Sequence, residues 1–279
     1  MKVVKDCYEC LQGLTYQAAS LATEDVGIRQ RAIDKGLEVL EESFSRDGVS
    51  IVIATKIHRV IREITRNPDP YREMKKKEIA LAGKLYREVI SEYGEDFRDC
   101  LKLAALGNVI DFFRSHDAIA EDMRKPVDFV IDDSKQLEAR LRQTGRILYL
   151  ADNAGEVFFD LPIIRWMRRF AWVSYVVKAS PVQDDITLED IRRAGMEFEI
   201  GRVITTGTAT PGIDFSLASP QFRHEYEDAD LIFAKGMGYY ESLSEFTATG
   251  KVFYCFMAKC KPVADSLGVP VNSYLAMLR

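Results

Sequence analysis

The sequence has few cysteines, few histidines and no long apolar run, and each shortage excludes a class of protein. Five cysteines in 279 residues is a small and odd number, so we do not expect a disulfide framework. No apolar stretch approaches the ~18 residues of a membrane span, and residues 1–6 lack the apolar character of a signal peptide. The sequence therefore predicts a cytoplasmic protein that does not contact a membrane.

The chain also lacks an excess of positive charge. Its 38 basic and 43 acidic side chains give a net charge of −5, so there is no general electrostatic reason to expect nucleic acid as a partner. Because 47% of the residues are apolar, the chain can bury a large core. A small anionic metabolite would need a local positive site.

Helical periodicity dominates the first half of the chain. Apolar residues recur at steps of three to five over residues 28–44, 53–64 and 79–93, and again from 101 to 113. Two prolines, at 68 and 70, separate the pattern at 53–64 from the pattern at 79–93. We therefore assign residues 1–143 to a helical domain.

Short continuous apolar runs replace this periodicity after residue 146. They cover residues 147–151, 172–177, 203–204, 231–234 and 252–256, and candidate helices at 157–170, 188–195 and 221–228 lie between them. This alternation is typical of βαβ units. It predicts an α/β fold class in which residues 144–279 form a three-layer α/β/α domain with a doubly wound, mostly parallel sheet.

In such a sheet, ligands bind beyond the carboxyl ends of the strands. The first two strand ends are acidic: Asp152 and Asn153 follow the first strand, and Asp184 and Asp185 lie in the loop after the next. Carboxylate and amide oxygens suit magnesium, manganese or a similar hard divalent ion. The alternative, that Asp152 and Asn153 only cap the following helix, stays open at this point.

Two later strand ends offer donors to an anion. Lys235 ends a strand and is followed by Gly236 and Gly238, whose backbone N–H groups can approach a phosphate closely. Further donors lie in the loop at Thr206 and Gly207 and at the helix start that contains Gly155. In the alternative interpretation, Lys235 is a solvated lysine beside a glycine turn.

Several familiar enzyme classes are excluded by missing motifs. The chain has no G-x-x-x-x-G-K-[ST] loop, no G-x-G-x-x-G after a strand and no G-x-S-x-G elbow. A haloacid-dehalogenase-like phosphatase needs a second aspartate two residues after Asp152, where this chain has Ala154. The usual partner of a covalent aspartyl-phosphate route is therefore missing.

The histidines and cysteines give weaker signals. The three histidines form no spaced cluster and are expected to be packing or surface residues: His58, His116 and His224. Four cysteines could assemble a thiolate metal site, because two of them form a C-x-x-C pair: Cys7, Cys10, Cys255 and Cys260. Free cysteines are also common as small buried apolar residues, so both interpretations stay open.

Taken together, the motifs resemble those of the metal-dependent damage-control phosphatases, formerly domain of unknown function 89. The resemblance spans nearly the whole chain and depends on the order of C-x-x-C at 7–10, D-P-Y at 69–71, G-N-V-I-D at 107–111, D-N-A-G-E at 152–156, D-I-T at 185–187, P-G at 211–212 and K-G-M-G-Y-Y-E at 235–241. It implies a helical domain on an α/β/α domain, and hydrolysis of phosphate monoesters of small metabolites with a divalent ion. The cysteine pair is similar to the bacterial and archaeal branch.

The resemblance also assigns roles to residues. It implies a metal held by Asp152, Asn153 and Asp185, with magnesium, manganese, cobalt or nickel as candidate ions. Lys235 takes the position of the phosphate-binding lysine, Asn108 and Asp111 help to close the site, and Glu156 supports it. Two departures concern ligand charge and substrate contacts: Asp184 stands where relatives commonly have Asn, and Met237 and Tyr239 where they often have Gln and Asn.

We therefore expect a phosphatase whose catalytic residues are Asp152, Asp185 and Lys235. The attacking group is either a water molecule or the Asp152 carboxylate, and Ala154 favours water. Two other functions remain as alternatives: an S-adenosylmethionine-dependent carboxyl methyltransferase and a non-catalytic binding module. Sugar phosphates, nucleotides and damaged phosphometabolites are all candidate substrates, and the sequence does not predict an oligomeric state.

Overall fold

The computed structural model describes residues 1–110, 116–246 and 249–279. Its helices are α1 (Lys5–Ala22), α2 (Val26–Ser43), α3 (Ser50–Thr65), α4 (Arg72–Val89), α5 (Phe97–Leu106), α6 (His116–Met123), α7 (Ser134–Leu141), α8 (Val157–Met167), α9 (Leu188–Ala194), α10 (Glu197–Ile200), α11 (Pro220–Asp228), α12 (Gly236–Leu243) and α13 (Lys261–Leu267), with 3-10 turns η1 (Ile90–Glu92), η2 (Gly107–Val109) and η3 (Ala154–Glu156). Its strands are β1 (Phe129–Asp132), β2 (Arg146–Leu150), β3 (Trp172–Val177), β4 (Val203–Thr205), β5 (Leu231–Lys235), β6 (Val252–Ala258) and β7 (Ser273–Leu278).

The strands form one sheet in the order β1-β7-β6-β5-β2-β3-β4 within the described residues. All neighbouring pairs are parallel except β6 and β7, which are antiparallel. The five strands predicted from apolar runs are confirmed. The short edge strand β1 and the antiparallel strand β7 were not predicted, because neither belongs to a βαβ repeat.

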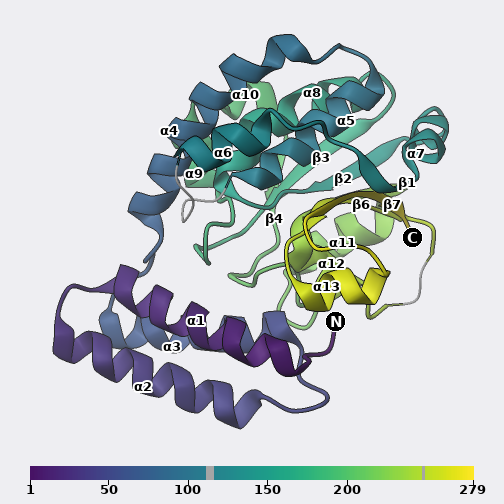
Figure 1. Cartoon of the computed structure of the whole chain (residues 1–279). Helices are drawn as coiled ribbons and strands as arrows, with labels where there is room; N and C mark the ends of the chain where they lie inside the picture. Colours follow the sequence, from purple (N-terminus) through teal and green to yellow (C-terminus); the bar gives the residue numbers. More distant parts are fainter. Residues whose placement is uncertain (111–115, 247–248) are drawn as a thin grey trace.

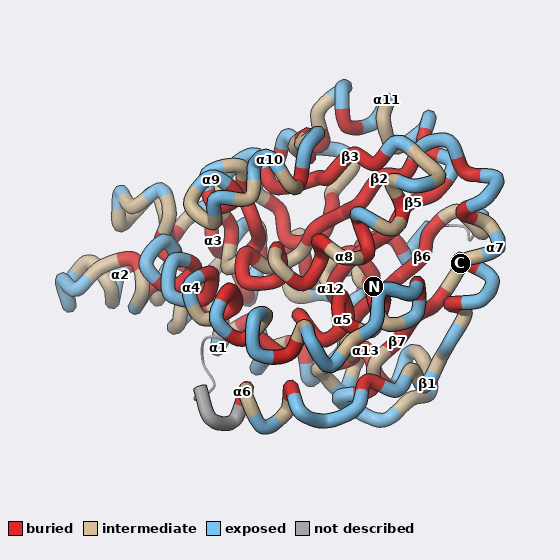
Figure 2. The backbone as a smooth tube through the Cα atoms, turned by 90° about the horizontal axis from the view of Figure 1, so that it is seen from above, coloured by how far each residue is buried: buried red, intermediate tan, exposed pale blue. Residues whose placement is uncertain are grey.

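Helices cover both faces of this sheet. Along β2, Ile147 and Tyr149 pack into one apolar cluster, whereas Leu148 and Leu150 pack into another. The first cluster includes residues of α4, α5 and α8, and the second includes residues of α11, α12 and α13. In Figure 2 the central strands accordingly run through the buried interior. The predicted α/β class and three-layer α/β/α arrangement are confirmed.

The first three helices form a separate bundle beside the sheet layers (Figure 1). Its core contains apolar residues from Val3 to Met74, whereas residues from Ile79 to Leu141 pack against the sheet. The division between cores therefore does not coincide with the predicted domain boundary at 143/144. Helical periodicity identifies an apolar helix face, but it does not show which surface that face covers.

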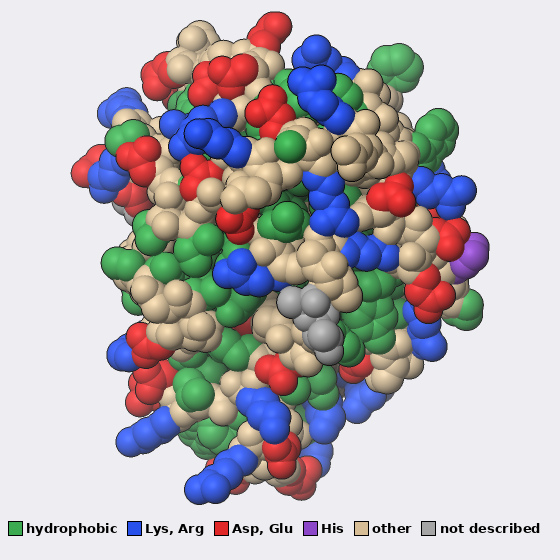
Figure 3. Space-filling view, turned by 90° about the vertical axis from the view of Figure 1, so that its right-hand side faces the viewer, with side chains coloured by type: hydrophobic (Ala, Val, Ile, Leu, Met, Phe, Trp, Pro, Cys, Tyr) green, Lys and Arg blue, Asp and Glu red, His purple; other side chains and the backbone are tan. Residues whose placement is uncertain are grey.

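No helix in the described part of the chain combines the length and apolar composition that a membrane crossing requires. On the molecular face shown in Figure 3, basic and acidic side chains are interspersed. This distribution matches the nearly balanced charges of the sequence.

A buried histidine joins the bundle to the turn before α4. His58 is 2% exposed, its Nδ1 donates to the Ala54 carbonyl at 2.8 Å, and its Nε2 lies 3.2 Å from the Tyr71 hydroxyl oxygen. Burial lowers the pKa of this imidazole from 6.5 to about 4. His58 is thus a neutral packing residue, and His224 is an exposed residue 3.5 Å from Asp228, as predicted for both. The side chain of His116 lies outside the described residues.

The buried imidazole predicts a pH-dependent loss of stability. Between pH 6.5 and about 4 the unfolded chain binds a proton at His58 that the folded chain does not bind. The free energy of unfolding should therefore fall as the pH falls, by about 2 kcal/mol between pH 6.5 and 5 from this residue alone. Urea unfolding at pH 6.5 and 5 measures this fall in the free energy of unfolding. The wild type and His224→Gln should both show the His58 contribution, and His58→Gln should not. Equal pH dependence in all three proteins would contradict the assignment.

Candidate active site

Two loops at the carboxyl ends of β2 and β3 are joined by backbone hydrogen bonds. Ala154 N donates to Asp184 O at 2.8 Å, and Ile186 N donates to Asp152 O at 2.8 Å. Between these two bonds, Asn153 and Asp185 pair as an isolated antiparallel bridge. The two strands are parallel neighbours, so their loops leave the sheet at the same edge. This backbone pairing brings Asp152, Asn153 and Asp185 side by side, as the sequence predicted for strand ends.

The carboxylates in these loops are crowded and buried. Burial, and then the charges of Glu156, Asp185 and Asp184, raise the pKa of Asp152 well above its ordinary value. Burial also raises the pKa of Asp185, against the opposing effect of Lys178. Asp185 Oδ2 accepts no hydrogen bond among the described residues and lies 3.2 Å from Lys178 Nζ. This set carries more negative than positive charge, and its oxygen donors fit a hard divalent cation.

Gly236 provides the space that the Asp152 carboxylate occupies. Its φ is +75°, and a Cβ atom at this position would overlap the carboxylate of Asp152. Only glycine tolerates both the left-handed backbone and the close approach. Gly236 therefore acts through Asp152, whereas its predicted contact with substrate has no support in the cavity described below.

A second lysine, which the sequence analysis missed, neutralises part of this charge. Lys178 follows β3 directly and is 1% exposed. Its ammonium donates to Gly212 O at 2.6 Å and to the Tyr239 hydroxyl at 3.0 Å, in addition to its ion pair with Asp185. The rule that ligands bind beyond the carboxyl ends of strands could have identified it, since Lys178 is the first residue after the predicted strand 172–177. Tyr239, one of the departures from the family pattern, thus helps to hold this lysine.

The helical half anchors the loop that carries Asp185. Lys75 on α4 is fully buried, and its ammonium lies 2.9 Å from Asp190 Oδ2 and 3.4 Å from Asp69 Oδ2. The same Asp190 oxygen accepts from Thr187 N at 3.0 Å and from Thr187 Oγ1 at 2.6 Å. Arg62 on α3 donates to Pro181 O at 2.7 Å. The loop is therefore held by the bundle side as well as by the sheet.

The paired loops form one end of a cavity of about 340 Å³. The acidic end includes Asp152, Asn153, Asp184 and Asp185, and Asn108 and Gly238 also line it. The opposite wall comes mainly from α1 and α3 and is largely apolar; it includes Leu11, Leu14, Ile51 and Ala54. Among the described residues that line the cavity, one is a lysine or arginine, Lys259.

The prediction that Lys235 contacts the substrate is contradicted by its surroundings. Its side chain is fully buried, and its ammonium donates to Ala104 O at 2.6 Å, Glu156 Oε2 at 2.7 Å and Asp160 Oδ1 at 3.0 Å. These partners use all three N–H groups. Although burial opposes the charge, the carboxylates of Asp160 and Glu156 keep the pKa of Lys235 raised. Lys235 therefore stabilises the interior beneath the cavity and does not line it.

Several other predicted substrate contacts also lie away from the cavity. Thr206 is buried, and its hydroxyl lies 3.3 Å from the Thr208 carbonyl oxygen. A Cβ on Gly207 would meet Ser219, and one on Gly155 would meet Ile110, so these glycines serve packing. Their loops close against α11 and α4, which sequence spacing does not reveal.

Of the remaining predicted site residues, two line the cavity, one lies behind it and one is outside the described residues. Asn108 and Gly238 line the cavity, as predicted. Glu156 is fully buried and supports the site indirectly, because Asn153 Nδ2 donates to its Oε1 at 3.2 Å. Asp111 lies outside the described residues.

The predicted set of four cysteines is not brought together. Cys7, Cys10 and Cys260 line the cavity. Cys255 is instead buried near Lys235, in the apolar cluster that contains residues of α4, α5 and α8. Burial raises the pKa of the three cavity thiols, which favours their protonated form. Within the described residues, no group of three or more His, Cys, Asp or Glu side chains is arranged as a metal site. The candidate set at the acidic loops contains two carboxylates and one amide.

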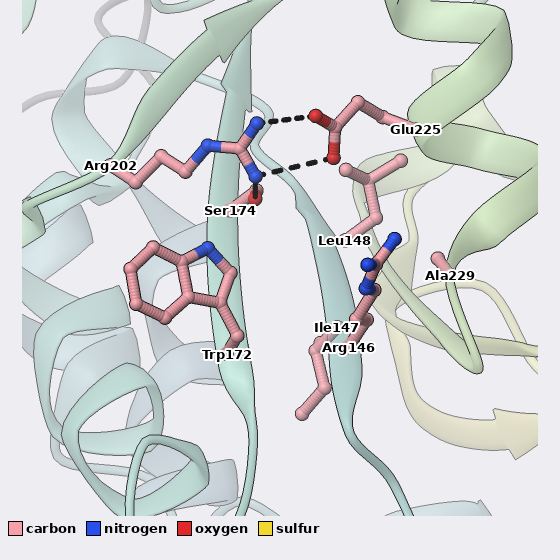
Figure 4. Close-up of a pocket in the computed structure, with 8 residues that line it drawn as sticks. All are labelled: Arg146, Ile147, Leu148, Trp172, Ser174, Arg202, Glu225 and Ala229. Carbon is pink, nitrogen blue, oxygen red and sulfur yellow. Dashed lines mark hydrogen bonds and ion pairs between the residues drawn. The ribbon is translucent and has the colours of Figure 1, made fainter.

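A second cavity, of about 430 Å³, lies near the amino ends of β2 and β3 (Figure 4). Its two arginines already have partners: Arg202 pairs with Glu225 and donates to Ser174 Oγ at 2.8 Å, and Arg146 lies 3.0 Å from Asp228. This end of the sheet is opposite the end where doubly wound folds bind ligands. We therefore assign the active site to the cavity at the acidic loops.

Comparisons with known proteins agree on one family. A family model described as damage-control phosphatase ARMT1-like domain matches residues 3–275. A damage-control phosphatase of Pyrococcus horikoshii is 34% identical over 99% of this chain and 98% of its own length, and one of Archaeoglobus fulgidus is 31% identical over 99% of both. A crystal structure of a DUF89 family protein from Pyrococcus horikoshii matches with a TM-score of 0.90 and 33% identity, over 100% of this chain and 99% of that one.

The surroundings of Lys235 predict a loss of stability when its charge is removed. Lys235→Met leaves the Glu156 and Asp160 carboxylates buried without their cation, so the free energy of unfolding should fall by about 3–5 kcal/mol. Urea denaturation measures this change. The matched control is Lys76→Met on the exposed face of α4, which should unfold like the wild type. A Lys235→Met protein as stable as the control would contradict the structural role.

Proposed function

Since the chain belongs to the ARMT1-like damage-control phosphatase family, we propose that it hydrolyses phosphate monoesters of small metabolites with a divalent metal ion. The observation that carries this proposal is the backbone pairing of the loops after β2 and β3. It gathers Asp152, Asn153 and Asp185 at the acidic end of the cavity. The space between this acidic end and the opposite wall, from α1 and α3, can hold the group that carries the phosphate.

The three loop residues are the proposed metal ligands. Asp152 and Asp185 offer carboxylate oxygens, and Asn153 offers its amide oxygen because its Nδ2 already donates to Glu156. Magnesium, manganese, cobalt and nickel are the candidate ions. When bound, such an ion supplies charge stabilisation at a phosphoryl oxygen and lowers the pKa of a coordinated water.

The chain's own groups then position the reaction. Glu156 orients Asn153, and Lys235 fixes Glu156 in turn through its 2.7 Å ion pair. Lys178 holds Asp185 in place and joins its loop to Gly212 across the sheet edge. These fixed contacts preorganise the ligands, so the reacting groups need alignment and little rearrangement.

We favour water as the attacking group. The position two residues after Asp152 is Ala154, which is fully buried and cannot protonate a leaving group in a covalent aspartyl-phosphate route. Attack by water on phosphorus breaks the bond to the ester oxygen and gives inorganic phosphate and an alcohol, with the water proton balancing the leaving alkoxide.

The cavity favours a compact leaving group. Its volume of about 340 Å³ is at the small end of the range for ligand sites. Its outer wall, from α1 and α3, is mostly apolar with a few polar groups, including Ser50 and Glu241. A sugar phosphate or another small phosphorylated metabolite fits this space better than an extended nucleotide.

Removing the charge of Asp152 should separate activity from stability. We expect Asp152→Asn and Asp185→Asn each to lower kcat/KM for p-nitrophenyl phosphate by about 100-fold or more, through loss of the metal. Without metal, Asp152→Asn should be at least as stable to heat as the wild type, because it removes a crowded buried charge. Asp185→Asn should be less stable, because it leaves the buried Lys178 without its carboxylate partner.

The control for these variants is Asp265→Asn, an exposed residue whose partner is Lys261. It should retain wild-type activity and metal affinity. Phosphate release that is unaffected by EDTA, or by both ligand substitutions, would refute the proposed function.

A further inference from the structure

A buried side-chain amide next to the end of β6 has only one of its two polar atoms paired among the described residues. Asn108, on η2, is 2% exposed and lines the active-site cavity. Its Oδ1 accepts from Met257 N at 3.1 Å. Because a backbone N–H can only donate, this bond fixes the orientation of the amide, and Nδ2 is the remaining group. Nδ2 is buried and has no partner among the described residues.

A lysine lies two residues beyond Met257 on the same strand end. Lys259 lines the same cavity, and its backbone N–H donates to Met237 Sδ at 3.2 Å, which ties the strand end to α12. Within the described part of the chain its ammonium forms no ion pair or hydrogen bond. Asp152 and Asp185 line the same cavity, so Lys259 shares it with the acidic loops.

The three buried lysines near the acidic loops are not available to a ligand. Lys178 and Lys235 each have three partners, and Lys75 is paired with Asp190 and Asp69. All three are at most 1% exposed. Among the described residues that line this cavity, a negatively charged substrate therefore meets one available cation, Lys259, and one unsatisfied N–H donor, Asn108 Nδ2.

We propose that Lys259 Nζ and Asn108 Nδ2 form the subsite that binds the non-bridging oxygens of the phosphoryl group. The inference rests on the proposed phosphatase function and assigns the phosphate-binding role to the end of β6 instead of to Lys235. An ammonium is a compact donor to a phosphate oxygen, and a buried amide donor gains most from an anionic acceptor. Together they would offset the negative charge of the phosphoryl group, which the carboxylates of the acidic loops repel.

Binding of inorganic phosphate tests the subsite without requiring turnover. Calorimetry in saturating Mg²⁺ should give a Kd for phosphate that is roughly 10- to 100-fold weaker in Lys259→Met, the size expected for a charge-assisted hydrogen bond. Lys259→Arg should remain within about fivefold of the wild type, because it keeps the charge. Asn108→Asp should weaken phosphate binding similarly: it retains an acceptor for Met257 N but replaces the donor with a negative charge.

The matched control is Lys261→Met, which removes an exposed cation that lies two residues further along and pairs with Asp265. Its phosphate affinity should be unchanged, and the Mg²⁺ affinity of Lys259→Met should stay within about threefold of the wild type. Thermal melting verifies that each variant is folded, and Lys259→Gln replaces Lys259→Met if the latter is not. A loss of phosphate affinity below fivefold in the folded Lys259 variant would overturn the assignment.

Hydrolysis of p-nitrophenyl phosphate separates this inference from the function on which it rests. Metal-dependent turnover in the wild type, with a KM raised at least tenfold in Lys259→Met and unchanged in Lys261→Met, supports both. Metal-dependent turnover with an unchanged KM in Lys259→Met overturns the subsite alone. No metal-dependent phosphate release by the wild type overturns the proposed function.

Discussion

The arrangement of the site depends on placing several carboxylates close together in the protein interior. An ionised carboxylate loses most of its hydration there, and its neighbours repel it, so each one needs a partner of opposite charge. Three fully buried lysines meet part of this need: Lys75 pairs with Asp190, Lys178 with Asp185, and Lys235 with Glu156 and Asp160. Asp152 keeps the strongest mutual repulsion, and there a metal ion would have its largest effect.

This distribution of charge explains why the two halves of the chain are needed together. Lys75 on α4 and Arg62 on α3 hold the Asp185 loop, and α3 together with α1 supplies the apolar wall of the cavity. The sheet supplies the proposed metal ligands through the paired loops of β2 and β3. A substrate in the cavity would have its phosphoryl group beside the proposed metal ligands and its leaving group against the apolar wall from α1 and α3. Lys259 and Asn108 would bind the phosphoryl oxygens near the end of β6.

The sequence was sufficient for five of the seven described strands and for the grouping of Asp152, Asn153 and Asp185 at one edge, because both follow from strand ends. Continuous apolar runs identify buried parallel strands, and polar residues just beyond them lie at one edge. Lys235 also ends a strand, but its side chain follows the alternation of Phe233 and so points toward the layer of α5 and α8. Lys259 could not be distinguished in this way, since its role depends on which other lysines are already paired.

The most direct test of the account is the position of the metal and of phosphate in a crystal. In crystals grown with Mn²⁺ and inorganic phosphate, anomalous diffraction at the manganese edge locates the metal, and the electron density locates the phosphate. The account predicts a manganese peak bounded by oxygens of Asp152, Asn153 and Asp185, with phosphate oxygens within hydrogen-bond distance of Lys259 Nζ. A manganese peak at the cavity thiols, or phosphate bound by Lys235, would contradict it.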